Sequence, residues 1–156
     1  MRAIEWAAQQ AFAHVGYPEL AVGEPTDAGA LSDAARDSLL LVAADARDKA
    51  VGFAICEEID ACLYVRELDV HPDHAGQKLG ARLLNAAADL ARQRRLPALT
   101  LTTFRQVPWN APYYARLGFI EMQEDEISPG LTLVLARQRA AGLDMANRLA
   151  MKRPVF

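Results

Sequence analysis

Apolar residues recur every three or four positions along residues 3–15, which is the spacing of one helix face. Gly16 and Pro18 end this first predicted helix. The stretch 78–95 repeats the pattern, with charged and amide side chains on its other face. A further helix over 129–141 starts at a Ser–Pro pair. Shorter helices are predicted over 32–37 and 111–117, the second with Asn110 as its cap and Gly118 at its end.

Short apolar runs bounded by turn-forming residues predict the strands. The first three runs follow one another through tight turns and form a meander. The next strand is reached through helix 78–95, and a strand–helix–strand connection makes its pairing parallel. Residues 16–31, rich in Gly and Pro, are interpreted as a loop that borders a site. The predicted strands are 39–44, 51–57, 62–70, 98–104, 119–122 and 148–153, the last of them an edge strand stopped by Pro154.

Length and composition indicate one domain over residues 1–156. The 17 basic and 20 acidic residues give a net charge of −3, which argues against nucleic-acid binding, since that needs a clustered basic excess. Cys56 and Cys62 lie in apolar runs and are interpreted as buried thiols in a reducing compartment. The chain shows no leader-like segment and no apolar run approaching about 18 residues. We therefore expect a cytoplasmic protein without a membrane partner.

A strand that passes through a glycine-containing turn into a helix occupies residues 65–84. No Ser, Thr, Asp or Asn stands at the usual cap position, and Lys78 lies in the first turn, where the helix dipole favours an acidic residue. Gly76 and Gly80 let a ligand approach the backbone closely, so a phosphate or pyrophosphate would supply the missing charge and acceptors. From these residues alone, a surface loop with hydrated amides accounts for the pattern equally well.

Three motifs stand in series in the chain: Glu67-Leu68-Asp69-Val70-His71-Pro72, Gly76-Gln77-Lys78-Leu79-Gly80-Ala81-Arg82-Leu83-Leu84 and Tyr114-Ala115-Arg116-Leu117-Gly118-Phe119. They resemble the acetyl-coenzyme A motifs of the GNAT superfamily of N-acetyltransferases, most clearly over residues 50–122. The resemblance implies a mixed α/β (α+β) fold. In it, a central and mostly antiparallel sheet contains one parallel, splayed strand pair and is flanked by helices.

The chain departs from the family in its phosphate loop. The family usually has Arg or Gln, then Gly, then Gly or Ala at the fixed positions, where this chain has Ala75, Lys78 and Gly80. Gly76 and Lys78 would compensate, Lys78 by a direct contact with a phosphate in place of a close backbone approach.

Two further departures lie outside that loop. The asparagine that often precedes the family's tyrosine falls on Val107, so Asn110 either takes its place or only caps the helix. The chain begins in a helix where family members usually begin with a strand. The sheet is therefore expected to be shorter, or to be completed by another segment or partner, which makes a homodimer reasonable.

The resemblance also implies roles for individual residues. The pantetheine arm of acetyl-CoA would pair with the backbone of 68–70, and the Val70 amide would polarise the thioester carbonyl, an interaction typically worth about 3–4 kcal/mol. Glu67 is the candidate base, or else a carboxylate paired with a cation on a half-exposed sheet face. Tyr114 resembles the general acid that protonates the thiolate, or else packs in the core. The implied cofactor-binding residues are Leu68, Asp69, Val70, Ala75, Gly76, Gln77, Lys78, Leu79, Gly80, Ala81, Asn110 and Tyr113.

The other reactive residues are weaker indicators of a functional site. His71, His74, Asp69 and Asp73 are not interpreted as a metal site, because neighbours at a strand end point to opposite faces and nothing completes a ligand shell. No metal is expected. Neither cysteine has a histidine placed by the sequence to activate it as a nucleophile. Three aromatic residues either line an acceptor pocket or belong to the core: Phe104, Trp109 and Tyr113.

Together these features predict an acetyl-CoA-dependent N-acetyltransferase that moves an acetyl group to the primary amine of a small molecule by direct attack. Acidic residues in 16–31 and 121–126 would favour a cationic amine. Two alternatives stay open. Ala75 and Lys78 suit a non-catalytic acyl-CoA-binding or regulatory module, and a protein or peptide N-acetyltransferase would need an open groove.

Overall fold

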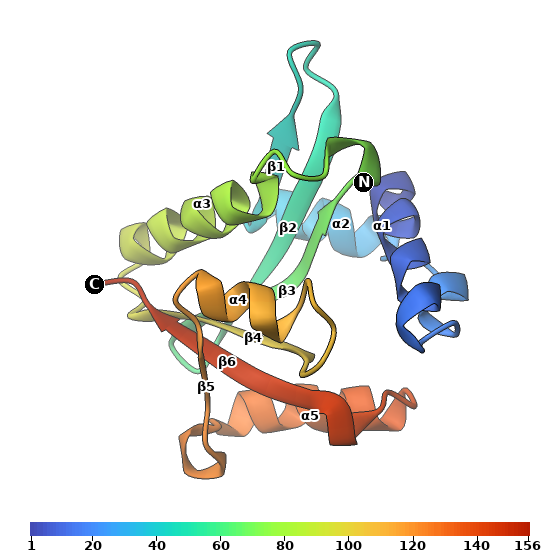
Figure 1. Ribbon diagram of the computed structural model, residues 1–156. Coiled ribbons are helices and arrows are strands. Elements are labelled where there is room, and N and C mark those ends of the chain that lie inside the picture. The colour runs from blue at the N-terminus through green and yellow to red at the C-terminus, as the bar shows by residue number, and fades with distance from the viewer. The chain divides into compact units, whose positions relative to one another are not determined.

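The computed structural model describes residues 1–156 and divides into two compact units (Figure 1). Unit 1 comprises Met1–Glu57 and Val65–Ala87, and unit 2 comprises Glu58–Tyr64 and Ala88–Phe156. The strands follow the order β1-β2-β3-β4-β6-β5 in one mixed sheet. Together with the helices, this order confirms the predicted fold class. The expectation of a single domain stays a prediction.

Unit 1 begins with helix α1 (Arg2–Gln9), which is shorter than the predicted helix over 3–15. From Gln10 to Val15 the backbone tightens into a 3-10 helix, which ends at Gly16 with a φ of 92°. Glycine adopts such a left-handed conformation at little cost. Over so few turns, the apolar spacing is compatible with an α-helix and with a 3-10 helix. The sequence pattern therefore does not predict the change from one to the other.

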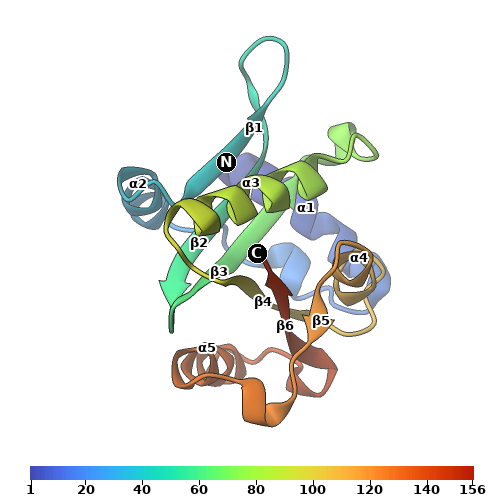
Figure 2. The same ribbon diagram turned by 90° about the vertical axis from the view of Figure 1, so that its left-hand side faces the viewer.

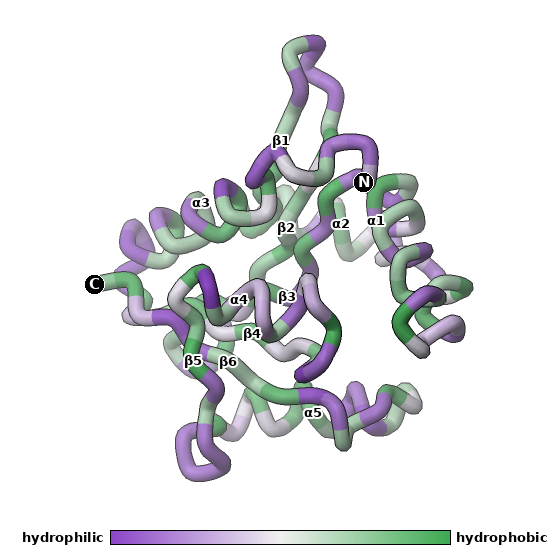
Figure 3. Tube along the Cα trace, viewed as in Figure 1, coloured by the Kyte–Doolittle hydropathy of each residue, from purple (hydrophilic) through white to green (hydrophobic).

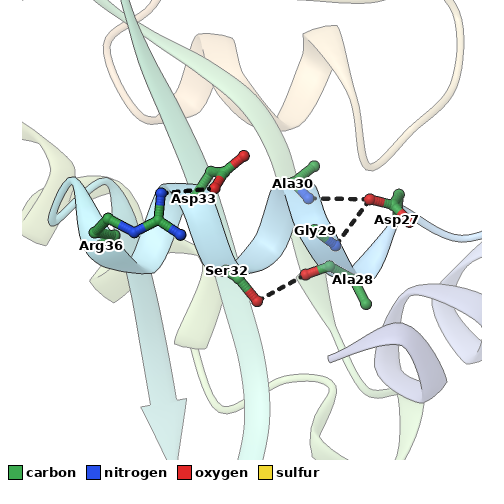
Figure 4. A network of polar contacts seen from close by, with 7 residues as sticks. All are labelled: Asp27, Ala28, Gly29, Ala30, Ser32, Asp33 and Arg36. Atoms are coloured by element: carbon green, nitrogen blue, oxygen red, sulfur yellow. Dashed lines mark hydrogen bonds and ion pairs between the residues drawn. The ribbon is translucent and has the colours of Figure 1, made fainter.

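Helix α2 (Ala28–Arg36) begins inside the stretch 16–31, for which the sequence pattern predicts only a loop. Its cap is Asp27, whose Oδ2 accepts hydrogen bonds from the backbone amides of Gly29 at 2.8 Å and Ala30 at 3.2 Å (Figure 4). The start predicted at residue 32 is therefore wrong, because an aspartate at 27 already satisfies the first free amides.

The strands β1 (Leu40–Ala44) and β2 (Ala50–Ile59) form the predicted antiparallel hairpin. Helices α1 and α2 contribute to one apolar cluster with β2. β1 stands at one end of the strand order and pairs with β2 alone. The buried members of the cluster are Ile4, Leu31, Ala34, Phe53 and Ile55.

The strand β3 (Cys62–Val70) has its predicted bounds, and helix α3 (Leu79–Gln93) lies within the predicted range 78–95. In Figure 2 the first part of α3 crosses over β2 and β3, and Figure 3 shows apolar and polar residues alternating along it. Gly52 of β2 permits close packing here, because a Cβ at that position would lie 3.0 Å from Asp69 O and 3.5 Å from Leu83 Cδ1.

In unit 2, β4 (Ala98–Phe104) is parallel to β3, as predicted. β6 (Arg148–Pro154) pairs antiparallel with β4 on one side and with β5 (Ile120–Glu121) on the other. The prediction that β6 is an edge strand is therefore wrong. Pro154 lies opposite Ala98 at the end of the ladder, where its missing N–H interrupts little, and the short β5 forms the edge instead.

Helix α4 (Ala111–Arg116) and helix α5 (Pro129–Ala140) lie where the sequence predicts them. The Ser128 side chain caps α5 by accepting from the Leu131 amide at 3.4 Å, and Gly142 follows the helix with a φ of 85°. α5 packs on the strands of unit 2 through a second apolar cluster. Its buried members are Tyr64, Met122, Leu131 and Ala150.

The two cysteines are free thiols, Cys56 buried and Cys62 half-buried. Burial raises the pKa of the Cys62 thiol. The preference for thiols over a disulfide is confirmed. None of the helices has the length and the apolar composition that a membrane crossing requires.

Candidate functional site

The candidate residues fall into one set in each unit. The unit 1 set begins where β3 ends. The His71 amide donates to Val51 O at 2.9 Å, which carries the pairing with β2 one residue past the strand. The His71 ring then accepts from the Asp73 amide at 3.3 Å and so caps the 3-10 helix Pro72–His74. This histidine shapes the turn, and no group of three or more His, Cys, Asp or Glu residues could hold a metal ion.

Lys78 is the last residue before α3 and has a φ of 58°. Its carbonyl accepts the hydrogen bond from the Arg82 amide at 3.0 Å. The prediction that it lies in the first helical turn is therefore corrected by one position. A left-handed backbone costs a residue with a Cβ about 1–2 kcal/mol. Lys78 therefore holds, at that cost, a conformation that glycine adopts freely.

The start of α3 suits an anion. The amides of Leu79, Gly80 and Ala81 precede the first intrahelical bond, so the helix itself supplies no acceptor for them. Gly76 has a φ of 79°, and a Cβ built on it would meet nothing within 4 Å. Free amides, the positive end of a 15-residue helix and the Lys78 ammonium group together fit a phosphate or pyrophosphate group.

Two carboxyl groups of β3 also belong to unit 1. Glu67 and Asp69 are two residues apart in β3 and therefore lie on one face of it. Asp69 as a whole is half-buried, but its Oδ2 is closed off from solvent and has no hydrogen-bond partner. Burial, the charge of Glu67 and a hydrogen bond with Glu67 raise the pKa of Asp69 to about 9, and the charge of Glu5 adds to the effect.

The unit 2 set surrounds α4. Asn110 occupies the cap position, but its side chain makes no capping hydrogen bond, and its carbonyl accepts from the Tyr114 amide at 2.9 Å. The Tyr114 ring contacts the rings of Tyr113 and Phe119 edge-on, with centroids 5.6 and 5.7 Å apart. Gly118 ends the helix with a φ of 87°, and this turn brings Phe119 back against Tyr114.

Sequence reasoning missed a polar network in unit 2. The hydroxyl of Thr102 in β4 lies 3.0 Å from the Tyr64 hydroxyl and accepts from Gln138 Nε2 at 2.8 Å and Arg148 Nη2 at 3.2 Å. The Arg148 guanidinium also lies over the buried ring of Phe104, 4.6 Å from its centroid. Phe104 therefore belongs to the core. Tyr64 and Thr102 stand on the predicted parallel strands, but no local signal pairs them with residues from α5 and β6.

Sequence reasoning also missed Glu5 and the acidic character of its surroundings. Glu5 is only 3% exposed and follows the buried Ile4 in α1. Its carboxylate accepts from the Thr26 amide at 2.9 Å and from the Thr26 hydroxyl at 3.1 Å. No local signal predicts this burial, because Gln9 lies one turn after Glu5 in the helix and Thr26 comes from a distant segment.

A family model described as the acetyltransferase (GNAT) family matches residues 2–119. Among solved structures, N-acetylglutamate synthase from Neisseria gonorrhoeae, complexed with coenzyme A and N-acetyl-glutamate, is 18% identical with a TM-score of 0.68, and the match covers 99% of this chain and 32% of that one. PaiA N-acetyltransferase from Thermoplasma acidophilum, in complex with coenzyme A, is 13% identical with a TM-score of 0.65, covering 97% and 89%.

A nourseothricin acetyltransferase is 21% identical with a TM-score of 0.56, and the match covers 75% of this chain and 65% of that one. This chain therefore spans less than two thirds of the length of that enzyme and of the synthase. At these identities, the likeness to the solved structures concerns the fold.

Proposed function

We propose that this chain, which belongs to the GNAT acetyltransferase family, is an acetyl-CoA-dependent N-acetyltransferase whose acceptor is the primary amine of a small molecule. The family's reaction is acetyl-CoA-dependent acyl transfer. The observation that supports the use of acetyl-CoA is the start of α3, where free amides, Gly76 and Lys78 suit a pyrophosphate group.

We assign the cofactor to the residues that the sequence singled out. The amides of 79–81 and the Lys78 ammonium group would hold the pyrophosphate, and the backbone of 68–70 would pair with the pantetheine arm. When bound, acetyl-CoA supplies an acetyl group activated as a thioester. The remaining assigned positions are Ala75, Gly76, Gln77, Asn110 and Tyr113.

The resemblance to the family assigns a role in the reaction to three groups of this chain. The Val70 amide would donate a hydrogen bond to the acetyl carbonyl oxygen. The Glu67 carboxylate would take the proton of the attacking amine, directly or through a water. The Tyr114 hydroxyl would donate a proton to the departing thiolate, because a phenol of pKa about 10 lies close to a thiol of about 8.5.

The preference for a small acceptor draws on two similar structures, a nourseothricin acetyltransferase and an N-acetylglutamate synthase. A peptide acceptor is the alternative within the same chemistry. We propose neither a nucleic-acid nor a membrane partner, given the net charge of −3. A cytoplasmic location and a homodimer remain part of the proposal.

The first experiment is thermal unfolding with and without acetyl-CoA. Ligand at about 100 times its dissociation constant adds roughly 2.7 kcal/mol, which for this size raises the Tm by several degrees. A desulfo analogue and an adenine-only fragment serve as controls, and each should give a smaller shift. The absence of any shift at millimolar acetyl-CoA would overturn the cofactor assignment.

The second experiment is Tyr114→Phe, assayed against a panel of amines. We expect turnover to fall by about 10²–10³-fold, because a general acid typically contributes that much, while the Tm shift with acetyl-CoA stays that of the natural chain. Binding without turnover in the natural chain would instead favour the non-catalytic acyl-CoA-binding module. Turnover of peptides but not of small amines would favour the peptide alternative.

A further inference from the structure

Three carboxyl groups of unit 1 influence one another. Glu67 and Asp69 share a face of β3 and are joined by a hydrogen bond, and Glu5 of α1 acts on Asp69 through its charge. These two glutamates act on Asp69 from different elements, Glu67 from the same strand and Glu5 from α1. A hydrogen bond between two carboxyl groups requires that one of them carry a proton.

The hydrogen-bond partners decide where that proton resides. Glu5 accepts two hydrogen bonds from Thr26 and one from Gln9 Nε2 at 3.4 Å, so its carboxyl oxygens already have donors. Asp69 has a buried Oδ2 without any donor. Ionising Asp69 would leave a buried charge unpaired beside two others, so the proton belongs on Asp69.

We propose that Asp69 is a positioning residue for Glu67: its protonated carboxyl group donates a hydrogen bond to the Glu67 carboxylate and holds Glu67 in one orientation as the charged member of the pair. The importance of this contact for catalysis rests on the proposed role of Glu67 as the base, but the contact itself does not. The Asp69 side chain thus acts separately from the Asp69 backbone, which the cofactor assignment uses.

The proton held by Asp69 makes the free energy of unfolding depend on pH. The folded chain keeps a proton on Asp69 up to a pKa of about 9, and the unfolded chain releases it near the ordinary value of 3.8. The folded state therefore binds more protons between these values, and the free energy of unfolding falls as the pH rises through that window. Above about pH 9, ionised Asp69 would repel Glu67, and the orientation of Glu67 would be lost.

The first test needs neither cofactor nor turnover. The carboxyl carbons of ¹³C-labelled aspartates are titrated by NMR, and the resonance absent from Asp69→Asn identifies Asp69. We expect it to titrate near pH 9 and the pH dependence of the Tm to be flatter in Asp69→Asn. Asp33→Asn is the matched control, because Asp33 is exposed on α2 and paired with Arg36 at 3.0 Å. Titration of Asp69 near pH 4 would overturn the proposal.

The second test separates positioning from packing. Asp69→Asn keeps an N–H donor for Glu67, so its kcat at pH 8 should exceed that of Asp69→Ala, which loses the donor, by about 10-fold or more, with the same KM for acetyl-CoA in the two variants. The natural enzyme should lose kcat above about pH 9, and Asp69→Asn should not. Natural kcat in Asp69→Ala would overturn the positioning role.

The two tests also distinguish this inference from the proposed function. If Asp69 titrates near pH 9 but no amine is acetylated, the proposed function has failed and the proton-sharing pair stands. If amines are acetylated but Asp69 titrates near pH 4, the inference has failed and the proposed function stands.

Discussion

Helices α2 and α3 begin in opposite ways. At α2 the cap is an anion, since Asp27 Oδ2 accepts hydrogen bonds from two first-turn amides. At α3 the residue before the helix is a cation, Lys78, in a left-handed conformation. A lysine has no acceptor for those amides and adds positive charge to the positive end of the helix dipole.

The difference shows which helix start serves the fold and which serves a ligand. Gly29 lets the Asp27 carboxylate lie close over the amides of α2, because a Cβ there would sit 2.7 Å from Asp27 Oδ2. Gly76 before α3 opens the space around the backbone, with no atom filling it. The first amides of α2 have a hydrogen-bond acceptor within the chain. The first amides of α3 have none, which lowers local stability and leaves these amides able to bind an external anion.

The largest expected effect comes from giving α3 the acidic start of α2. Lys78→Asp should weaken acetyl-CoA binding about 100-fold, because a charge-assisted contact is replaced by repulsion at a cost of roughly 3 kcal/mol. Without ligand, the same change should raise the free energy of unfolding by about 0.5–1 kcal/mol, since an anion suits the helix dipole. Calorimetric titration measures the first effect, and denaturant unfolding measures the second.

The matched control is Lys49→Asp, which makes the same charge change in the exposed turn between β1 and β2. Its acetyl-CoA affinity should stay within about twofold of the natural value, because a charge outside the site is screened by salt. Equal affinity in Lys78→Asp and the natural chain would mean that the start of α3 does not hold the phosphates.

The sequence predicts most of the elements of the fold and less of the detail of the candidate site. β3, β4 and α5 lie where the apolar runs and caps place them, because these signals are local. The conformation of Lys78 has no such signal: lysine is a good helix former, and its φ of 58° in the structure shows that it precedes α3.

Other features depend on contacts between distant segments. The pKa of Asp69 is raised by burial, by Glu67 and by Glu5, and Glu5 comes from a different element. The interior place of β6 depends on pairing with β5, a strand too short to be recognised as a partner from the sequence. Such features depend on how the elements assemble, and they cannot be predicted from the periodicity within one element.

A smaller effect should follow from restoring the family's glycine. Lys78→Gly relieves about 1–2 kcal/mol of left-handed strain but adds freedom to the unfolded chain, so the unfolding free energy should rise by a net amount of about 0.5–1 kcal/mol. Acetyl-CoA affinity should fall about tenfold, because the charged contact is lost. An affinity that rises instead would show that close backbone approach matters at this position and that the lysine hinders it.

The smallest effect concerns α2 alone. Asp27→Ala removes the acceptor of two amides and should lower the unfolding free energy by about 1 kcal/mol, or the Tm by about 2–4 °C. Asp27→Asn keeps an acceptor oxygen and should recover most of that loss. Both variants should bind acetyl-CoA with the natural dissociation constant. A binding defect in Asp27→Ala that Asp27→Asn repairs would mean that the start of α2 also serves the ligand, and the contrast between the two helices would fail.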